Sequence, residues 1–235
     1  MGSRGGAICS TYSQIDISGV MFVGNEANGG SGGTDAVNLR RDTNKLAQVV
    51  RGGAADFTNC RVTISSTTFK QNRAQDASVR AAGGALALGE GSVVEATRCW
   101  FDRNTALRGG QITFGGALRV DAGSSFRAVD TNFDGNAVDA PAEGFGGAIA
   151  TDGSLALGGG VVFRANAVYG DVRAAGGAIA VLSVTASFNA SELPGPVFVE
   201  NAVRLAPRPA SQLQAKANAA FGIRYRRFSA RMWNF

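Results

Sequence analysis

The segment RCWFDRNTA, Arg98–Ala106, contains one copy of the motif that decides the fold of this 235-residue chain. In this copy, Phe-x-x-Asn lies at Phe101 and Asn104. The six copies are Phe22/Asn25, Phe69/Asn72, Phe101/Asn104, Phe133/Asn136, Phe163/Asn166 and Phe198/Asn201. A second motif, Gly-Gly-Ala, starts at Gly5, Gly52, Gly83, Gly115, Gly146 and Gly176. Two coupled motifs, with Gly-Gly starts 30 to 32 residues apart after the first repeat, indicate an internal repeat rather than an isolated active site.

Apolar residues within each repeat follow the period of short strands. Residues seven and five places before each Phe alternate with polar ones, as Val94 and Ala96 do before Phe101. A second column lies three residues into each Gly-Gly-Ala motif: Ile8, Ala55, Leu86, Leu118, Ile149 and Ile179. A third lies two residues after each Asn: Ala27, Ala74, Ala106, Val138, Val168 and Val203. The pattern predicts three short strands per repeat. Because one repeat cannot bury its own apolar side, it also predicts an all-β solenoid, a parallel β-helix of about six coils.

The Phe and Asn columns are interpreted as a structural ladder. Each buried Phe contributes about 1.5–3 kcal/mol through removal of apolar surface from water. The Asn side chains are expected to satisfy turn backbone groups and to bond from coil to coil, as stacked Asn does in cross-β ladders. The register also places Glu95 beside Arg127 on adjacent coils, which agrees with charged residues facing solvent.

Composition excludes several kinds of site. The chain has 33 glycines, five prolines and no histidine, which removes the commonest general base and the commonest zinc ligand. Cys9, Cys60 and Cys99 show no Cys-x-x-Cys spacing and are interpreted as small apolar residues. We therefore expect no metal and no cofactor.

The net charge of +5 is unevenly distributed. Residues 206–235 form a tail with six basic residues and no acidic ones, so the body, residues 1–205, holds 17 basic and 18 acidic residues. A nearly neutral body gives no basic stripe, and we expect no nucleic-acid partner. The body is predicted to be the β-helix domain.

An insertion of about residues 28–47 interrupts the first repeat. It is rich in glycine and contains Arg40, Arg41 and Lys45, which are candidate binding residues because solenoid insertions project sideways. A plain surface excursion is the alternative interpretation.

The tail is predicted to contain a short amphipathic helix. Ser211 is a candidate cap, and Phe221, Tyr225, Phe228, Met232 and Phe235 follow at steps of three and four residues. We interpret this face as a cap over the last coil or as a contact with a protein partner. Binding to an anionic membrane surface is the alternative. The candidate binding residues in the tail are Tyr225, Arg226, Arg227 and Trp233.

One pair of acidic residues fits a catalytic interpretation. Asp102 and Asp134 directly follow Phe101 and Phe133, so they lie on neighbouring coils, a spacing that suits a polysaccharide lyase or hydrolase. Lys70 and Arg164 occupy the same column and could hold a uronate carboxylate. The same column can be interpreted as a solvated ladder of compensated charges, which we favour.

Two further aspartates and one cysteine lie near these candidates. Asp121 and Asp152 lie in DAGS and DGS, which are ordinary turn sequences. Cys99 is expected to be buried rather than nucleophilic.

The coupled motifs resemble the repeats of the polymorphic outer membrane proteins of chlamydiae, over about residues 5–203. The resemblance implies a right-handed β-helix, an extracellular or cell-surface location and a structural or adhesive role, with a protein or an extracellular polysaccharide as partner. Autotransporter members of that family also carry a signal peptide and a translocator barrel, and this chain shows neither pattern. We therefore expect a fragment or module whose first coil stacks end to end on a further repeat or another subunit.

Overall fold

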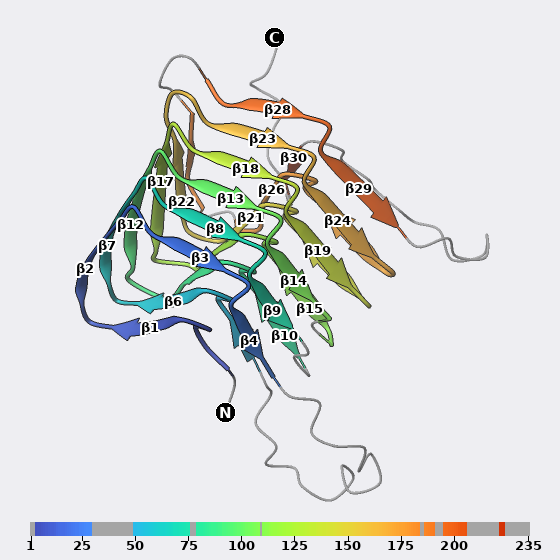
Figure 1. The fold of residues 1–235 in the computed structure, drawn as a ribbon. Helices are drawn as coiled ribbons and strands as arrows, with labels where there is room; N and C mark the ends of the chain where they lie inside the picture. The colour runs from blue at the N-terminus through green and yellow to red at the C-terminus, as the bar shows by residue number, and fades with distance from the viewer. Residues whose placement is uncertain are drawn as a thin grey trace, which may run out of the picture.

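The computed structural model describes residues 3–29, 49–75, 79–108, 110–183, 186–190, 195–205 and 221–223. Every helix or strand assigned within these residues is a β-strand, and every strand pair between coils is parallel. The chain winds through five sheets, and Figure 1 shows the coils stacked from the N-terminal to the C-terminal end, so that each sheet holds one strand from each successive coil. The predicted right-handed parallel β-helix is confirmed.

The five sheets are named here in the order of the chain within one coil. Sheet A holds β5 (Val49–Arg51), β10 (Arg80–Ala82), β15 (Ile112–Phe114), β20 (Glu143–Phe145) and β25 (Arg173–Ala175). Sheet B holds β1 (Ile8–Thr11), β6 (Ala55–Thr58), β11 (Leu86–Leu88), β16 (Leu118–Val120), β21 (Ile149–Thr151), β26 (Ile179–Val181) and β30 (Phe221–Ile223).

The remaining sheets have six strands each. Sheet C holds β2 (Gln14–Ser18), β7 (Arg61–Ser65), β12 (Val93–Thr97), β17 (Ser125–Val129), β22 (Ser154–Leu157) and β27 (Phe188–Asn189). Sheet D holds β3 (Met21–Val23), β8 (Thr68–Lys70), β13 (Trp100–Asp102), β18 (Asn132–Asp134), β23 (Val162–Arg164) and β28 (Val197–Val199). Sheet E holds β4 (Glu26–Asn28), β9 (Arg73–Gln75), β14 (Thr105–Leu107), β19 (Ala137–Ala140), β24 (Ala167–Gly170) and β29 (Ala202–Leu205).

The prediction of three strands per coil is wrong, because a complete coil has five. Sheets C and D are separate strands because the chain turns between them through residues in the left-handed region, at Ser66 (φ 47°), Arg98 (φ 53°) and Asp130 (φ 47°). Sheet A was not predicted because its strands have no apolar column: the central residue varies from Val50 to Thr113 to Gly144. Such strands show no apolar periodicity from which the sequence could predict them.

The six Phe residues of the repeat stack in one column inside the coil. Rings on adjacent coils have centroids 4.7 to 5.0 Å apart and planes within 7° of parallel. The column is the centre of an apolar core enclosed by sheets B, C and D. Phe69, Phe101, Phe133 and Phe163 are completely buried. Phe198, at the C-terminal end of the column, is half-buried.

The six Asn residues form a continuous hydrogen-bond ladder at the turn between sheets D and E. The backbone N–H and the Nδ2 amide of Asn72 both donate to Oδ1 of Asn104, at 3.0 and 2.9 Å. The Nδ2 amide of Asn72 also donates to the carbonyl of Phe22 on the preceding coil, at 3.0 Å. The Asn-to-Asn contacts repeat from Asn25 to Asn201.

Asn166 shows the same contacts near the C-terminal end of the ladder. It is completely buried, and its Oδ1 accepts from the backbone N–H and the Nδ2 amide of Asn136, both at 3.0 Å. The backbone N–H and Nδ2 amide of Asn166 donate in turn to Oδ1 of Asn201, at 3.1 and 2.9 Å. The Nδ2 amide of Asn166 also donates to the carbonyl of Phe133 at 2.9 Å. The internal Asn residues thus satisfy groups on the coils before and after them, whereas Asn25 and Asn201, at the two ends, are only half-buried.

Sheet A is a middle layer with apolar contacts on both faces. One face packs on sheet E through small residues such as Val50, Ala74 and Ala81. The opposite face packs on the outer face of sheet B, where Phe145 contacts Ala150. The Gly-Gly corner passes close to the start of sheet E: a Cβ atom added to Gly84 would lie 2.5 Å from the Thr105 backbone and 2.1 Å from the Gly116 carbonyl oxygen of the next coil. Glycine is therefore required there.

Most of the tail and the insertion lies outside the described residues. Within the tail, Phe221–Ile223 pairs with β26 as strand β30, so the helix predicted there does not include these three residues. The candidates Arg40, Arg41 and Lys45 of the insertion lie outside the described part of the chain. So do the tail candidates Tyr225, Arg226, Arg227 and Trp233.

We expect Asn104→Ala to lower the free energy of unfolding by about 3 kcal/mol, because it leaves the buried Asn72 amide and the Phe69 carbonyl without their partner. Asn132→Ala, at an exposed position on sheet D, is the matched control and should change stability by less than about 0.5 kcal/mol. Urea unfolding followed by circular dichroism measures both. Equal effects of the two substitutions would contradict the role given to the ladder.

Candidate functional site

The outer face of sheet D carries two columns of side chains in register. The first contains Thr68, Trp100 and Asn132 on consecutive coils. The second contains Lys70, Asp102 and Asp134 at the same levels, followed by Arg164. The parallel register places these residues beside one another because each Phe-x-x-Asn motif puts its Phe at the centre of a sheet D strand.

The two candidate catalytic carboxylates differ in their surroundings. Asp102 is largely buried, and its oxygens contact Lys70 Nζ at 3.4 Å and Arg103 Nε at 3.0 Å. Asp134 is half-buried on the neighbouring strand, with its Cα paired to that of Asp102. Lys70 and Arg103 therefore compensate the negative charge of Asp102.

Exposed apolar side chains gather on the same face. Ten large hydrophobic residues are exposed among the described residues, and five of them belong to sheet D. Met21 and Val23 lie on the first strand of sheet D, Trp100 lies on the third, and Val197 and Val199 lie on the last. The Trp100 side chain is 49% exposed in the middle of the sheet, between the hydroxyl of Thr68 and the amide of Asn132.

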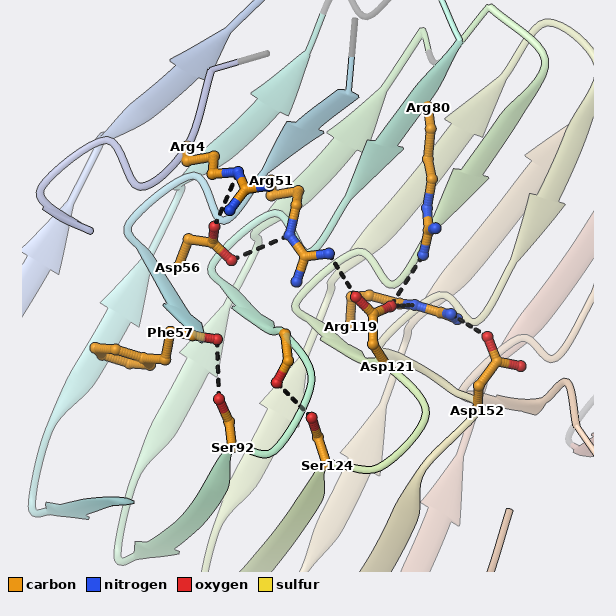
Figure 2. A network of polar contacts seen from close by, with 11 residues as sticks. Arg4, Arg51, Asp56, Phe57, Arg80, Ser92, Arg119, Asp121, Ser124 and Asp152 are labelled. Carbon is orange, nitrogen blue, oxygen red and sulfur yellow. Dashed lines mark hydrogen bonds and ion pairs between the residues drawn. The ribbon is translucent and has the colours of Figure 1, made fainter. Parts of the chain in front are cut away.

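A second cluster of functional groups lies where the outer faces of sheets A and B meet (Figure 2). Arg51 directly precedes its Gly-Gly pair at the end of β5, and Asp56 lies on β6 just after it. Arg80 comes from β10 and Arg119 from β16, while Asp121 directly follows β16. We call Arg51, Asp56, Arg80, Arg119, Asp121 and Asp152 the arginine–aspartate network.

Asp121 is the centre of this network. Its carboxylate accepts hydrogen bonds from Arg51 Nη1, from Arg80 Nη2 at 3.0 Å and from Arg119 Nε at 2.8 Å. Arg51 and Asp121 are 70 residues apart in the chain. The network thus ties three successive coils together across the junction of sheets A and B.

Asp56 and Asp152 complete the network. Arg51 Nε donates to Asp56 at 3.1 Å, and Arg4 Nε approaches the other oxygen of Asp56 at 3.7 Å. Arg119 Nη2 donates to Asp152 on the next coil.

The sequence interpretation of Asp121 and Asp152 as turn residues was incomplete. Asp121 does form a turn, since its carbonyl accepts a hydrogen bond from the Ser124 N–H at 3.1 Å. The ion pairs were missed because Arg51, Arg80 and Arg119 occupy different positions in their repeats and form no column in the sequence. The only sequence signal was the presence of charged residues beside the Gly-Gly corner.

Burial makes the electrostatics of the network strong. The side chains of Arg119 and Asp56 are 3% and 1% exposed. Burial alone would raise the pKa of Asp121, but Arg51, Arg119 and Arg80 outweigh it and lower this pKa to about 2. Burial also lowers the pKa of Arg80, and the neighbouring Arg119 adds to that effect. Burial alone would lower the pKa of Arg51, but Asp56 and Asp121 outweigh it and raise this pKa. The arginines and aspartates of the network thus stabilise one another's charged forms.

An aromatic ring supports two of the guanidinium groups. Arg80 and Arg119 lie over the Phe114 ring, with Cζ 4.7 and 4.6 Å from its centroid. Such cation–π contacts contribute about 0.5–2 kcal/mol each and hold the two planar groups in place.

Three guanidinium nitrogens in the network have no hydrogen-bond partner. They are Arg51 Nη2, Arg80 Nε and Arg119 Nη1, and each is buried. In the described residues only one other buried side-chain polar atom, Thr105 Oγ1, is unpartnered.

The three cysteines belong to neither cluster. Cys60 and Cys99 are buried, and burial raises the pKa of the Cys99 thiol, whereas Cys9 is exposed, contrary to its interpretation as an apolar core residue. No group of three or more potential metal ligands occurs among the described residues. The same residues contain no helix long and apolar enough to cross a membrane.

We expect Asp121→Asn to lower the free energy of unfolding by about 2 kcal/mol at pH 7, since it removes a carboxylate whose pKa the neighbouring arginines depress in spite of its burial. In the native protein this stabilisation is complete above pH 4 and is lost as pH falls from about 4 towards 2, because the folded-state pKa lies below its ordinary value. The variant should lack this part of the pH dependence.

Chemical unfolding at pH 7, 4, 3 and 2.5 measures the effect. Asp16→Asn, at an exposed position on sheet C, is the control. A variant curve parallel to that of the native protein over this range would contradict the prediction.

Comparisons with known proteins give no match: no family model, no curated protein and no solved structure is similar to the chain at a significant level. The assignment of the fold therefore rests on the sheet topology and register described above. The chain is a parallel β-helix repeat protein, and its resemblance to the polymorphic outer membrane proteins stays a prediction.

Proposed function

We propose that this chain is a non-catalytic structural or adhesive module of a surface protein, and that it binds its partner through the outer face of sheet D. The observation that carries the proposal is that half of the exposed large hydrophobic side chains among the described residues belong to that one face, with Trp100 in its middle. Exposed apolar side chains that collect on one face of a soluble domain mark an interaction surface. A solenoid suits this role because stacking extends the same face from coil to coil.

The chemistry of the face favours an extracellular polysaccharide as the partner, with a protein as the alternative. Trp100 presents a flat apolar ring, and Thr68 and Asn132 place a hydroxyl and an amide on either side of it. An apolar platform flanked by hydrogen-bonding groups complements a sugar ring, which has apolar C–H faces and polar hydroxyl edges. The surface location itself is supported only by the resemblance of the repeats.

The charged column next to Trp100 supports a binding role over a catalytic one. Catalysis by a carboxylate pair needs one group protonated and one free, which the protein arranges through different surroundings. Here the carboxylate of Asp102 is held by Lys70 and Arg103. Both oxygens of Asp102 thus already contact a cation, which favours a charge-compensating role for this carboxylate over direct contact with a reacting substrate.

Assembly is a second part of the proposal. In the described residues, strands β2, β3 and β4 of the first coil pair on one side only. Unpaired strand edges are templates for further pairing. We propose that a further repeat or another subunit stacks end to end on this coil.

Cleavage of an acidic polysaccharide through Asp102 and Asp134 is the alternative function. The observation that favours it is the register, which pairs the two residues on adjacent strands. Lys70 and Arg164 flank them in the same column.

We expect Trp100→Ala to weaken binding at least tenfold to any polysaccharide whose migration the native protein retards, because it removes the apolar platform at the centre of the face. Purified protein is mixed with labelled acidic and neutral polysaccharides, and mobility is followed by gel electrophoresis. Tyr12→Ala, at an exposed aromatic residue outside sheet D, is the matched control and should bind as the native protein does. If the Trp100→Ala variant retards the same polysaccharides as strongly as the Tyr12→Ala variant does, sheet D is excluded as the binding face.

The same gels distinguish binding from cleavage. Intact but retarded chains support the adhesive proposal, and shortened chains overturn it. The double substitution Asp102→Asn with Asp134→Asn should leave retardation nearly unchanged if the module only binds. It should abolish shortening if the alternative is correct.

A further inference from the structure

The asparagine ladder has a direction, and its two ends differ chemically. Along the ladder, the backbone N–H and the Nδ2 amide of each Asn donate to Oδ1 of the Asn on the next coil, as Asn136 does to Asn166 at 3.0 Å. At the N-terminal end, Asn25 donates to Asn72 in this way, but Oδ1 of Asn25 accepts no hydrogen bond within the described part of the chain. At the C-terminal end, Asn201 accepts from Asn166, but its backbone N–H donates to no group among the same residues.

The two ends of the ladder complement each other. Nδ2 of Asn201 donates to the Phe163 carbonyl at 3.0 Å, and its second hydrogen and the backbone N–H of Asn201 can donate to one Oδ1 on a further coil. Asn25 offers such an Oδ1. Inside the ladder each Asn also donates to a Phe carbonyl on the preceding coil, as Asn72 does to Phe22 at 3.0 Å, and the second Nδ2 hydrogen of Asn25 is available for the same contact. The ladder of one copy can therefore continue into the ladder of a second copy.

Apolar side chains are less covered at the same two ends. Phe22 on the first coil is 9% exposed, whereas Phe69, its counterpart on the second coil, is completely buried. On the last coil of sheet E, Val203 is half-buried, although Val168 on the coil before it is completely buried. Packing against a further coil is favourable at both ends, because it removes this apolar surface from water.

Strand β30 occupies part of the C-terminal end. It pairs with β26 through three residues, Phe221–Ile223, in the place that the sheet B strand of a further coil takes. Neighbouring strands of a sheet lie about 4.8 Å apart, so β1 of a second copy can reach β26 only when β30 leaves. In its own chain β1 pairs with β6 through four residues in the same parallel sense. Strand β30 and a second copy therefore compete for the edge of β26.

We propose that a second copy of this chain stacks head to tail on the C-terminal coil, where its Asn25 accepts from Asn201 and its β1 replaces β30 on β26. This identity of the partner rests on the end-to-end assembly proposed above. Contact between two like ends would reverse the strand direction and take the Asn residues out of line, so only unlike ends continue the ladder. A head-to-tail contact leaves one end of each kind free, and the coils stack along one axis (Figure 1), so the product is an open fibre.

Sedimentation velocity of the full chain measures this assembly. Gly222→Pro removes the backbone N–H from the centre of β30 and so weakens its pairing with β26. We expect this variant to form oligomers at a concentration at least tenfold below that of the native protein, whereas Gly222→Ala, which keeps the N–H, should assemble as the native protein does. Monomers of both the native protein and Gly222→Pro at about 1 mM, where even a weak specific contact is populated, would overturn the proposal. Equal assembly of these two proteins would overturn the role given to β30.

Blocking the N-terminal end tests the direction of stacking. Asp16 is exposed in the middle of β2, the edge strand of sheet C. The Arg61 N–H of β7 donates to the Ser13 carbonyl at 2.9 Å, and the alternation of bonds along a parallel strand then directs the Asp16 N–H away from β7. Asp16→Pro, made together with Gly222→Pro, removes this outward donor without removing a bond to β7. We expect the double variant to be monomeric, whereas Asp16→Asn in the same background keeps the N–H and should still assemble.

Blocking the C-terminal end completes the test. Asn201→Asp, again with Gly222→Pro, keeps an acceptor for Asn166 but places a carboxylate oxygen against Oδ1 of Asn25 in the joint. We expect this variant alone to be monomeric. An equal mixture of the two blocked variants should form dimers and nothing larger, because one supplies an intact C-terminal end and the other an intact N-terminal end. Oligomers of either blocked variant alone, or no dimers in the mixture, would contradict head-to-tail stacking.

Failure of self-assembly is distinguishable from failure of the proposed binding function. Asp16 lies on sheet C, so the monomeric Asp16→Pro variant should retard polysaccharides as strongly per molecule as the native protein does. A chain that retards polysaccharides through Trp100 but stays monomeric refutes the stacking of copies and leaves the binding face of sheet D intact. A chain that assembles but retards no polysaccharide supports the stacking and contradicts the polysaccharide as partner.

Discussion

The asparagine ladder is the interaction on which the remainder of the structure depends. The coils can lie in register only if the turn between sheets D and E repeats identically, and this turn buries backbone groups that strand pairing does not satisfy. Asn104 meets that requirement with one side chain, which accepts from Asn72 and donates to Phe69 and Asn136. A carboxylate or an aliphatic residue there could not do both. The stacked Phe rings and the aligned outer columns follow from this register.

The fifth sheet, sheet A, adds a layer to the solenoid and makes its outer faces differ from one another. Sheet A packs on sheet E by one face and on the outside of sheet B by the other. The second contact creates a buried junction, apolar at its C-terminal end around Phe145 and charged around Asp121. Sheet D has no such cover in the described residues and presents Trp100 to solvent. The buried ion-pair network and the candidate binding face are thus consequences of one arrangement: the junction of sheets A and B buries arginines and aspartates together, and the uncovered sheet D carries half of the exposed large hydrophobic side chains among the described residues.

Periodic contacts could be predicted from the sequence, and non-periodic ones could not. The alignment of Glu95 with Arg127 and of Asp102 with Asp134 followed directly from the spacing of Phe-x-x-Asn. Sheet A was missed because Val50, Thr113 and Gly144 share neither size nor polarity. The pairing of Arg51 with Asp121 was missed because it depends on the angle between sheets A and B, which a repeat spacing does not contain.

Native-state hydrogen exchange measured by NMR tests the central claim, that the asparagine ladder holds the coils in register. The backbone amides of Asn72, Asn104 and Asn136 each donate to the side chain of the next Asn, the last of them to Asn166. The account predicts that these amides exchange only when the whole domain unfolds, with a free energy of opening equal to that of global unfolding. Exchange of these three amides within minutes at neutral pH, in a protein that is otherwise folded, would contradict it.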